Sequence, residues 1–150
     1  MGGGIKQGNT TALSEFNFYC DSIAANKVIQ SGIKIYLSAL DATSQVYFEE
    51  EEFKTMPETN KKTVFIKDTV AYYMSLDPYM HDALAVLSLM NHSIFNYDKR
   101  QLNVLVSPGI ADGMLYDDRK DERSNVMFVQ VPNRKKVVEE VINRITTYQD

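Results

Sequence analysis

MGGGIKQGNTTALSEFNFYCD, residues 1–21, opens the chain and places four glycines in its first eight positions. Glycine tolerates positive φ and lets a backbone approach a ligand closely. Side chains that can form hydrogen bonds follow at Asn9, Glu15 and Asn17. This composition predicts a ligand-binding loop. The alternative interpretation is a flexible N-terminal tail that leads into a helix cap.

The order of residues in this loop favours a neutral ligand. Residues 3–10 come within one residue of the phosphate-binding pattern GxxxxGK[ST], but Asn9 occupies the position of its lysine. An anionic ligand is therefore a poor fit. A carboxylate at Glu15 between two amides suits a molecule with several hydroxyl groups, because hydroxyls can donate to the carboxylate and exchange both kinds of hydrogen bond with the amides.

Composition indicates an ordinary globular protein and excludes several classes. The chain has 150 residues, of which 44% are hydrophobic and 24% charged, so we expect a single domain over residues 1–150. A net charge of -4 without a basic run argues against a nucleic-acid partner. No apolar stretch reaches transmembrane length and the N-terminus is polar, so we expect a cytoplasmic protein without a membrane partner. The lone cysteine, Cys20, should be a buried thiol.

Helix and strand patterns alternate along the first part of the chain. Asp21 can cap a helix that ends at Gly32, and residues 33–40 (IKIYLSAL) are typical of a strand buried on both faces. This order of helix, glycine and buried strand favours a parallel sheet. Residues 41–43 then follow the carboxyl end of the strand, where open parallel sheets bind their ligands.

Two further helices lead to a second informative stretch. The acidic run at residues 49–52 predicts a solvated helix start, and residues 59–75 have helical spacing. Residues 80–90 (MHDALAVLSLM) predict a helix that is apolar on nearly every side and therefore buried in a larger body. His81 and Asp82 stand at its N-terminus, where a loop can present both to a cleft. Alternatively, Asp82 is an N-cap and His81 a loop residue.

The C-terminal part has a structural pattern. It predicts strands at residues 101–107, 114–117 and 125–131 and a closing helix at residues 134–148, which should pack the fold without contacting substrate. The acidic residues in DDRKDE, residues 117–122, could indicate a metal site. Basic residues are interleaved with them, so a solvated hairpin turn is the favoured interpretation.

Several motifs, in this order, resemble the inosine-uridine nucleoside hydrolase family. The opening loop carries MGGG, GN.T and EFN, and HDALAV at residues 81–86 looks like the HDPLAV of the family, with Ala83 in place of proline. This change removes a helix-starting residue but no functional group. LDAT at residues 40–43 looks like LDVT, and SPGIADGMLYD at residues 107–117 extends the resemblance over nearly the whole chain.

The resemblance implies an α/β fold. It would have a Rossmann-like, open, mainly parallel sheet flanked by helices, with antiparallel strands toward the C-terminus. Family members hydrolyse the N-glycosidic bond of ribonucleosides to ribose and a free base, and they use a calcium ion that holds the ribose diol and the attacking water. By resemblance, Asn9, Glu15 and Asn17 should bind ribose hydroxyls, while Met1 and Phe16 line the sugar pocket.

The same resemblance assigns the second motif. His81 would be the general acid that protonates the leaving base, and Asp82 would be a calcium ligand. The family's aspartate cluster DxDxxDD does not occur in these residues, which correspond to the C-terminal portion of a family member. Because calcium takes six to eight oxygen ligands, the remaining ligands are expected from the missing N-terminal half.

Two hypotheses follow from the incomplete ligand set. The chain alone should be catalytically inert, and the face that joins the rest of the fold should be an apolar surface or open edge prone to association. The leading interpretation is a truncated or split ribonucleoside hydrolase, with an N-terminal-half chain as possible partner and homo-oligomers as in the family. The alternative is a non-catalytic ribose- or nucleoside-binding remnant or an interaction module.

Overall fold

The structure is a computed structural model that describes residues 1–117, 125–131 and 133–147. Helices and strands alternate along it, as in an α/β protein. The helices are α1 (Phe16–Cys20), α2 (Ser22–Ile29), α3 (Leu40–Thr43), α4 (Glu50–Lys54), α5 (Lys61–Met74), α6 (His81–Met90) and α7 (Arg134–Thr146), with a 3-10 turn η1 (His92–Ile94). The strands are β1 (Ile35–Leu37), β2 (Asn96–Arg100), β3 (Leu102–Val104), β4 (Leu115–Asp117) and β5 (Val126–Gln130).

The strands form two small sheets. The first has the order β1-β5-β2, in which β1 runs parallel and β2 antiparallel to the central strand β5. The second pairs β3 with β4 antiparallel. The α/β class and the antiparallel strands toward the C-terminus are therefore confirmed. Within the described residues the three-stranded sheet is mixed, because its one parallel pairing is β1 with β5.

Two of the expected strands connect differently from the prediction. β4 and β5 belong to different sheets, so the expected hairpin between them is wrong. Residues 118–122 of its turn lie outside the described residues, as does Tyr148 of the expected closing helix. Periodicity also missed β2, because its sequence NYDKR is mostly polar, which is common at the exposed edge of a sheet.

Helix caps explain most of the helix boundaries. The Asp21 side chain accepts a hydrogen bond from the Ala24 amide at 2.8 Å and starts α2, and Gly32 with φ of 79° follows its end. Glu49 forms a capping box at the start of α4, as the acidic run predicted. Asn60 caps α5 in the same manner. The Asp21 cap and the acidic start of α4 lie within a few residues of their helix boundaries, which is why the sequence predicted both, whereas it predicted α5 from helical spacing without the Asn60 cap.

The strand expected at residues 33–40 is shorter than its apolar pattern suggested. β1 ends at Leu37, and Leu40 begins the short helix α3. The Leu40 amide donates to the Gly3 carbonyl at 2.9 Å, and the Asp41 carboxylate accepts from the Ile5 amide at 2.8 Å. The glycine loop therefore binds the Leu40 amide, a backbone group that a longer strand could have used for pairing.

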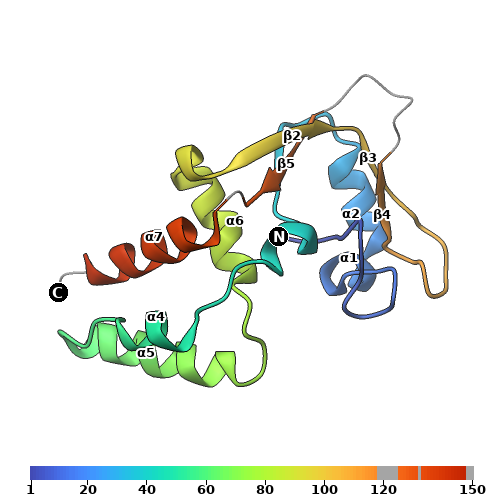
Figure 1. The fold of residues 1–150 in the computed structure, drawn as a ribbon. Helices are drawn as coiled ribbons and strands as arrows, with labels where there is room; N and C mark the ends of the chain where they lie inside the picture. The colour runs from blue at the N-terminus through green and yellow to red at the C-terminus, as the bar shows by residue number, and fades with distance from the viewer. Residues whose placement is uncertain (118–124, 132, 148–150) are drawn as a thin grey trace.

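Two apolar cores lie on opposite faces of β5. Phe128 belongs to a core formed mainly by α1, α2, β1, β3 and β4, whereas its neighbour Val129 belongs to a core formed mainly by α3 to α7. Successive side chains of a strand point to opposite faces, so one strand contributes to both. Figure 1 shows the corresponding groups of elements on either side of the molecule, with the N-terminus between them.

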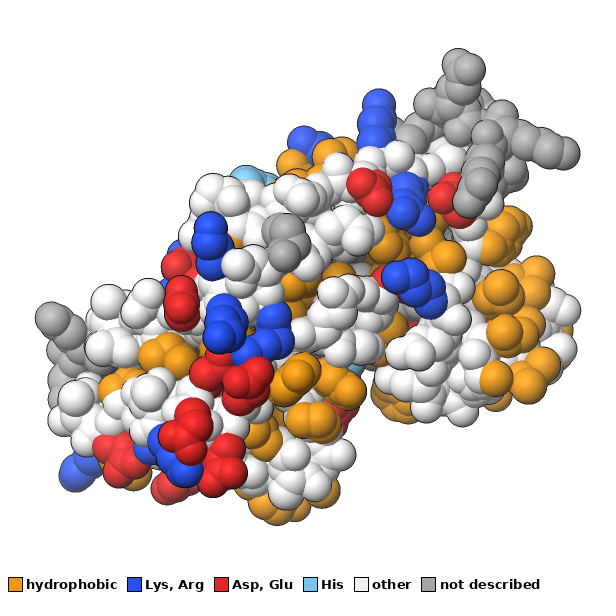
Figure 2. Space-filling model, viewed as in Figure 1, with side chains coloured by type: hydrophobic (Ala, Val, Ile, Leu, Met, Phe, Trp, Pro, Cys, Tyr) orange, Lys and Arg blue, Asp and Glu red, His pale blue; other side chains and the backbone are white. Residues whose placement is uncertain are grey.

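An ionic cluster joins α4 to α7. The Arg134 guanidinium lies 2.8 Å from both Glu49 and Glu52 and donates to the Tyr47 carbonyl at 2.7 Å. Its hydrogen bond lowers the pKa of the Glu52 carboxyl. Figure 2 shows acidic and basic side chains gathered over these helices.

α6 is buried on one face only, so the expectation of complete burial is wrong for the described residues. Leu84 and Leu87 are buried, but Val86, Leu89 and Met90 are 57%, 55% and 57% exposed. The expectation of a buried thiol is also wrong, because Cys20 is exposed. In the part of the chain that the structure describes, no helix is long and apolar enough to cross a membrane.

Candidate functional site

The glycine loop is folded closely over the side chain of Phe18. Gly3 has φ of 70°, and a Cβ atom there would lie 2.9 Å from the Phe18 ring and 3.0 Å from Leu115. A larger residue would therefore be strained and crowded at this position. The Gly2 amide also donates to the Ser38 carbonyl at 3.3 Å. These contacts attach the loop to the end of β1 and exclude the interpretation of a detached tail.

The Glu15 carboxylate lies inside the loop and accepts hydrogen bonds from its backbone amides. Glu15 is 2% exposed. Its Oε2 accepts from the amides of Gly3 at 2.7 Å and Phe18 at 3.1 Å, and its Oε1 accepts from the Asn17 amide at 2.8 Å. An ionised carboxylate offers about four acceptor positions, so about one remains for a ligand. Much of the binding capacity that the sequence assigned to Glu15 is used to cap α1 and hold the loop.

The other expected sugar-binding residues surround this loop. Asn9 accepts a hydrogen bond from the Phe16 amide at 2.9 Å, and both residues are exposed. The Asn17 amide group lies 3.5 Å from the Met1 carbonyl and 3.4 Å from its sulfur. The structure therefore brings the five predicted loop residues together in one segment, in which Asn9, Phe16 and Asn17 are exposed and Glu15 is buried.

His81 lies at the first position of α6 and is held by two side chains. Its Nδ1 is 2.7 Å from Thr43 Oγ1, and its Nε2 is 3.2 Å from Asp77 Oδ2. Sequence reasoning missed both partners. The position of residues 41–43 after a strand pointed to this edge of the sheet, but no signal singled out Thr43, because its contact with His81 spans a sequence separation of 38 residues.

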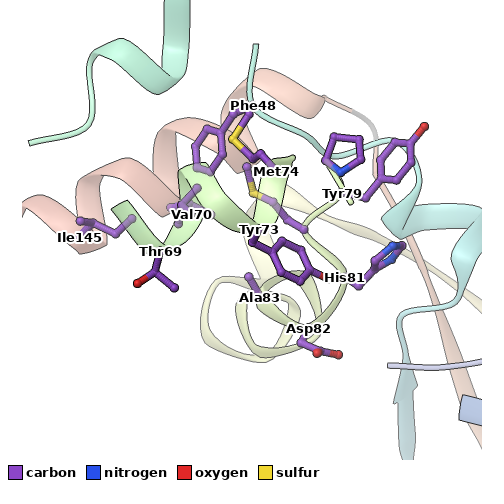
Figure 3. Close-up of a pocket in the computed structure, with 13 residues that line it drawn as sticks. Phe48, Thr69, Val70, Tyr73, Met74, Tyr79, His81, Asp82, Ala83 and Ile145 are labelled. Atoms are coloured by element: carbon purple, nitrogen blue, oxygen red, sulfur yellow. The ribbon is translucent and has the colours of Figure 1, made fainter. Parts of the chain in front are cut away.

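Asp82 lies in the first turn of α6 and is exposed. The N-cap position belongs to Met80, without a side-chain cap, so the interpretation of Asp82 as the N-cap is wrong. Within the described residues its carboxylate accepts no hydrogen bond, and Figure 3 shows it directed away from the other labelled side chains. It is therefore free to bind another group.

The short helix α3 connects the glycine loop to His81. The Leu40 amide at the start of α3 donates to the Gly3 carbonyl, and Thr43 at its end contacts the imidazole. Four helical residues extend about 6 Å. The loop and His81 are thus attached to the two ends of one short helix, although no direct bond joins them among the described residues.

A pocket of about 390 Å³ lies beside His81, between α5, α7 and the start of α6. Its walls are mainly apolar, and His81 and Asp82 also line it. None of the five loop residues lines this pocket. Burial, followed by the charges of Asp77 and Asp82, raises the pKa of Tyr73 in its wall, so this phenol stays protonated at neutral pH.

The described residues do not form a calcium site by themselves. No group of three histidine, cysteine, aspartate or glutamate side chains among residues 1–117, 125–131 and 133–147 could hold a metal ion. Asp41, the acidic residue of α3, accepts hydrogen bonds from the amides of Ile5 and Lys6. Asp82 could therefore supply only one or two of the six to eight oxygen ligands that calcium takes.

Comparisons with known proteins identify relatives over most of the chain. The chain is 34% identical over 99 residues to the non-specific ribonucleoside hydrolase RihC of Shigella boydii, which is 63% of this chain and 33% of that protein. It is 25% identical over 163 aligned residues to the pyrimidine-specific ribonucleoside hydrolase RihA of the same species, covering 99% of this chain and 52% of that protein. The chain spans between a third and about half of these relatives.

Solved structures share the fold. The purine-preferring ribonucleoside hydrolase from Gardnerella vaginalis matches 97% of this chain and 50% of its own, with a TM-score of 0.85 at 24% identity. The inosine-uridine preferring nucleoside hydrolase from Bacillus anthracis gives a TM-score of 0.79 at 22% identity, covering 97% and 49%. The family described as inosine-uridine preferring nucleoside hydrolase matches residues 1–141. This match confirms the resemblance, and the chain belongs to the inosine-uridine preferring nucleoside hydrolase family.

Proposed function

We propose that this chain supplies the ribose-binding loop and the proton donor of a ribonucleoside hydrolase. The observation that carries the proposal is the attachment of the glycine loop and the His81 imidazole to opposite ends of α3. Membership of the nucleoside hydrolase family supports the reaction class. The relatives are named for non-specific, pyrimidine-specific and purine-preferring hydrolysis, so base preference stays open.

The reaction needs a proton at the leaving base. The oxygen of water bonds to C1′ of the ribose, the C1′–N bond breaks, and its electron pair leaves with the base. In this proposal the imidazolium form of His81 gives its Nε2 proton to the base and remains as neutral imidazole with its proton on Nδ1, and Nε2 is the donor because its 3.2 Å contact with Asp77 is the longer of the two. An aspartate of the DxDxxDD cluster takes the proton released by water.

The loop holds the sugar in this proposal. Asn9 and Asn17 have exposed amide groups, and Glu15 keeps about one acceptor position. Met1 and Phe16 flank these groups. Because glycosidic cleavage has an oxocarbenium-like transition state, hydrogen bonds to ribose hydroxyls that strengthen there increase rate as well as affinity.

The metal requirement is part of the proposal. Asp82 would provide one carboxylate ligand to a hard cation such as calcium, with the other ligands coming from the aspartate-bearing half of the family's fold. Such an ion would hold the ribose diol and the attacking water. An N-terminal-half partner chain, homo-oligomers and a cytoplasmic location also stay proposals. The alternative function is nucleoside or ribose binding without catalysis, which is supported for the chain alone by the lack of a group of three metal-binding side chains among the described residues.

Hydrolysis assays test the proposal. The chain is incubated with calcium and inosine, uridine or p-nitrophenyl riboside, alone and mixed with the aspartate-bearing N-terminal half of a family member. We expect hydrolysis only in the mixture. Ribose or nucleoside binding without hydrolysis in any mixture would favour the alternative function.

The variant His81→Ala tests whether His81 is the general acid. His81→Ala should lower kcat/KM for inosine and uridine by about 10²- to 10⁴-fold. The loss for p-nitrophenyl riboside should be much smaller, because nitrophenolate leaves without a proton. His92→Ala, which changes the chain's other histidine, is the matched control. Equal losses on all three substrates would remove His81 from the acid role.

A further inference from the structure

The two side chains that contact the His81 imidazole differ in their hydrogen-bonding capacity: the Asp77 carboxylate only accepts, whereas the Thr43 hydroxyl can also donate. The Asp77 carboxylate faces Nε2 at 3.2 Å and is itself held by the Tyr79 amide, which lies 3.1 Å from its Oδ1. An ionised carboxylate only accepts hydrogen bonds, so this contact requires a proton on Nε2. A neutral imidazole then has an unprotonated Nδ1, which needs a donor.

Thr43 is placed to be that donor. It is 0% exposed, and its hydroxyl oxygen lies 2.7 Å from Nδ1. Within the described part of the chain, His81 is the only hydrogen-bond partner of this hydroxyl. A threonine hydroxyl can donate one hydrogen and also accept, so it can bind both the neutral imidazole and the imidazolium. Water competes little for this contact because the hydroxyl is fully buried.

We propose that Thr43 is a positioning residue that fixes the ring orientation of His81, because its hydroxyl donates to Nδ1 of the resting neutral imidazole, whose proton is on Nε2, and accepts from Nδ1 of the imidazolium. The inference rests on the proposed function, in which the imidazolium gives its Nε2 proton to the leaving base and keeps its Nδ1 proton, which the Thr43 hydroxyl oxygen accepts. Thr43 would not contact the substrate. It acts by holding the imidazole from the side opposite to the donating nitrogen.

The same helix gives this contact a geometric role. Leu40 and Asp41 of α3 bind the glycine loop, through the Gly3 carbonyl and the Ile5 amide, while Thr43 binds His81. α3 therefore sets the position of the imidazole relative to the loop that would hold the sugar. A misplaced acid loses rate even when the sugar still binds, because proton transfer requires hydrogen-bond distance.

NMR tests the contact without requiring activity. The chain is labelled with ¹⁵N-histidine, and the tautomer is read at about two pH units above the ordinary histidine pKa of about 6.5, where imidazole is neutral. The chain has two histidines, so His92→Gln assigns the signals. We expect the wild-type His81 proton on Nε2. Thr43→Val should move the Nδ1 resonance toward that of an unbonded nitrogen, and Thr43→Ser should keep it.

Controls separate positioning from stability. Thr63→Val removes another fully buried threonine hydroxyl, whose bonds lie within the cap of α5. It should lower stability without moving the His81 resonances. A wild-type proton on Nδ1, or an Nδ1 resonance unchanged by Thr43→Val, would overturn the inference.

Hydrolysis kinetics of the chain mixed with the aspartate-bearing N-terminal half of a family member provide a second measurement. Thr43→Val should lower kcat for inosine about tenfold, the size of one lost hydrogen bond, with KM unchanged within about twofold. Hydrolysis of p-nitrophenyl riboside should stay near wild type, and Thr43→Ser should restore inosine hydrolysis. Equal losses on both substrates would overturn the positioning role. An expected NMR result without any His81-dependent hydrolysis would refute the proposed function but leave the Thr43 contact established.

Discussion

At the scale of single residues, Glu15 shows how a side chain predicted to bind ligand is used to build the loop first. Its two oxygens accept from three backbone amides, those of Gly3, Asn17 and Phe18. Backbone donors in a buried loop need partners, and a carboxylate provides several at once. The ionised acid therefore fixes the loop that carries the exposed amides of Asn9 and Asn17.

This arrangement predicts the effect of Glu15→Gln. The carboxamide has one oxygen and one NH₂ group, so at least one backbone amide loses its acceptor and meets a donor. We expect a loss of about 1–3 kcal/mol in the free energy of unfolding. Urea denaturation at pH 7 measures it. Glu139→Gln, an exposed residue of α7, is the control, and equal stability of the two variants would contradict the prediction.

His81 shows which part of a residue's role the sequence can predict. The HDALAV motif identified His81 and Asp82 by resemblance, because both stand at the start of a helix whose pattern is local. The hydrogen-bond partners of the His81 imidazole are Thr43 and Asp77. Asp77 lies only four residues from His81 in the sequence. Thr43 lies 38 residues away, so its contact with His81 exists only in the folded chain.

At the scale of elements, α6 has one unpartnered face in the described residues. Residues four apart on a helix lie on one face, and those seven or eight apart return to it. Asp82, Val86, Leu89 and Met90 share such a face and are exposed. The expected metal ligand and the apolar stripe therefore point the same way, so a chain that covers the stripe also approaches Asp82.

This stripe predicts self-association of the chain, with a second copy as the occupant. Exposed apolar patches favour association, so the weight-average mass should rise above the 17.1 kDa monomer as concentration increases. The double variant Val86→Lys with Leu89→Lys should reduce that rise in sedimentation equilibrium. Phe65→Lys changes an exposed apolar residue of α5 and serves as the matched control. An equal reduction in the control would show that general charge, not the α6 face, governs association.

At the scale of the whole molecule, β5 joins the two apolar cores. Phe128 and Val129 are both buried, in different cores, although they are neighbours in sequence. β5 also pairs with both β1 and β2. The two groups of helices in Figure 1 therefore share one strand, which should make their unfolding cooperative.

Shortening the Phe128 side chain of β5 tests this coupling. Phe128→Ala should lower the free energy of unfolding by about 3–5 kcal/mol through lost burial and a cavity. Far-ultraviolet circular dichroism and tyrosine fluorescence should report one coincident urea transition in the wild type and the variant. Two separate transitions in the variant would show that the cores unfold independently.

The sequence by itself determined the features that depend on neighbouring residues. These are the cap of α2, the acidic start of α4, the helical spacing of α5, the glycine loop, the start of α6 near His81, and the family to which the motifs belong. Only the tertiary structure decided the mixed order β1-β5-β2, the early end of β1, the exposed face of α6 and the contact of Thr43 with His81. The physical reason is range: helix caps and turns arise within a few residues, whereas strand order, burial and side-chain partners depend on segments that meet only after the chain has folded.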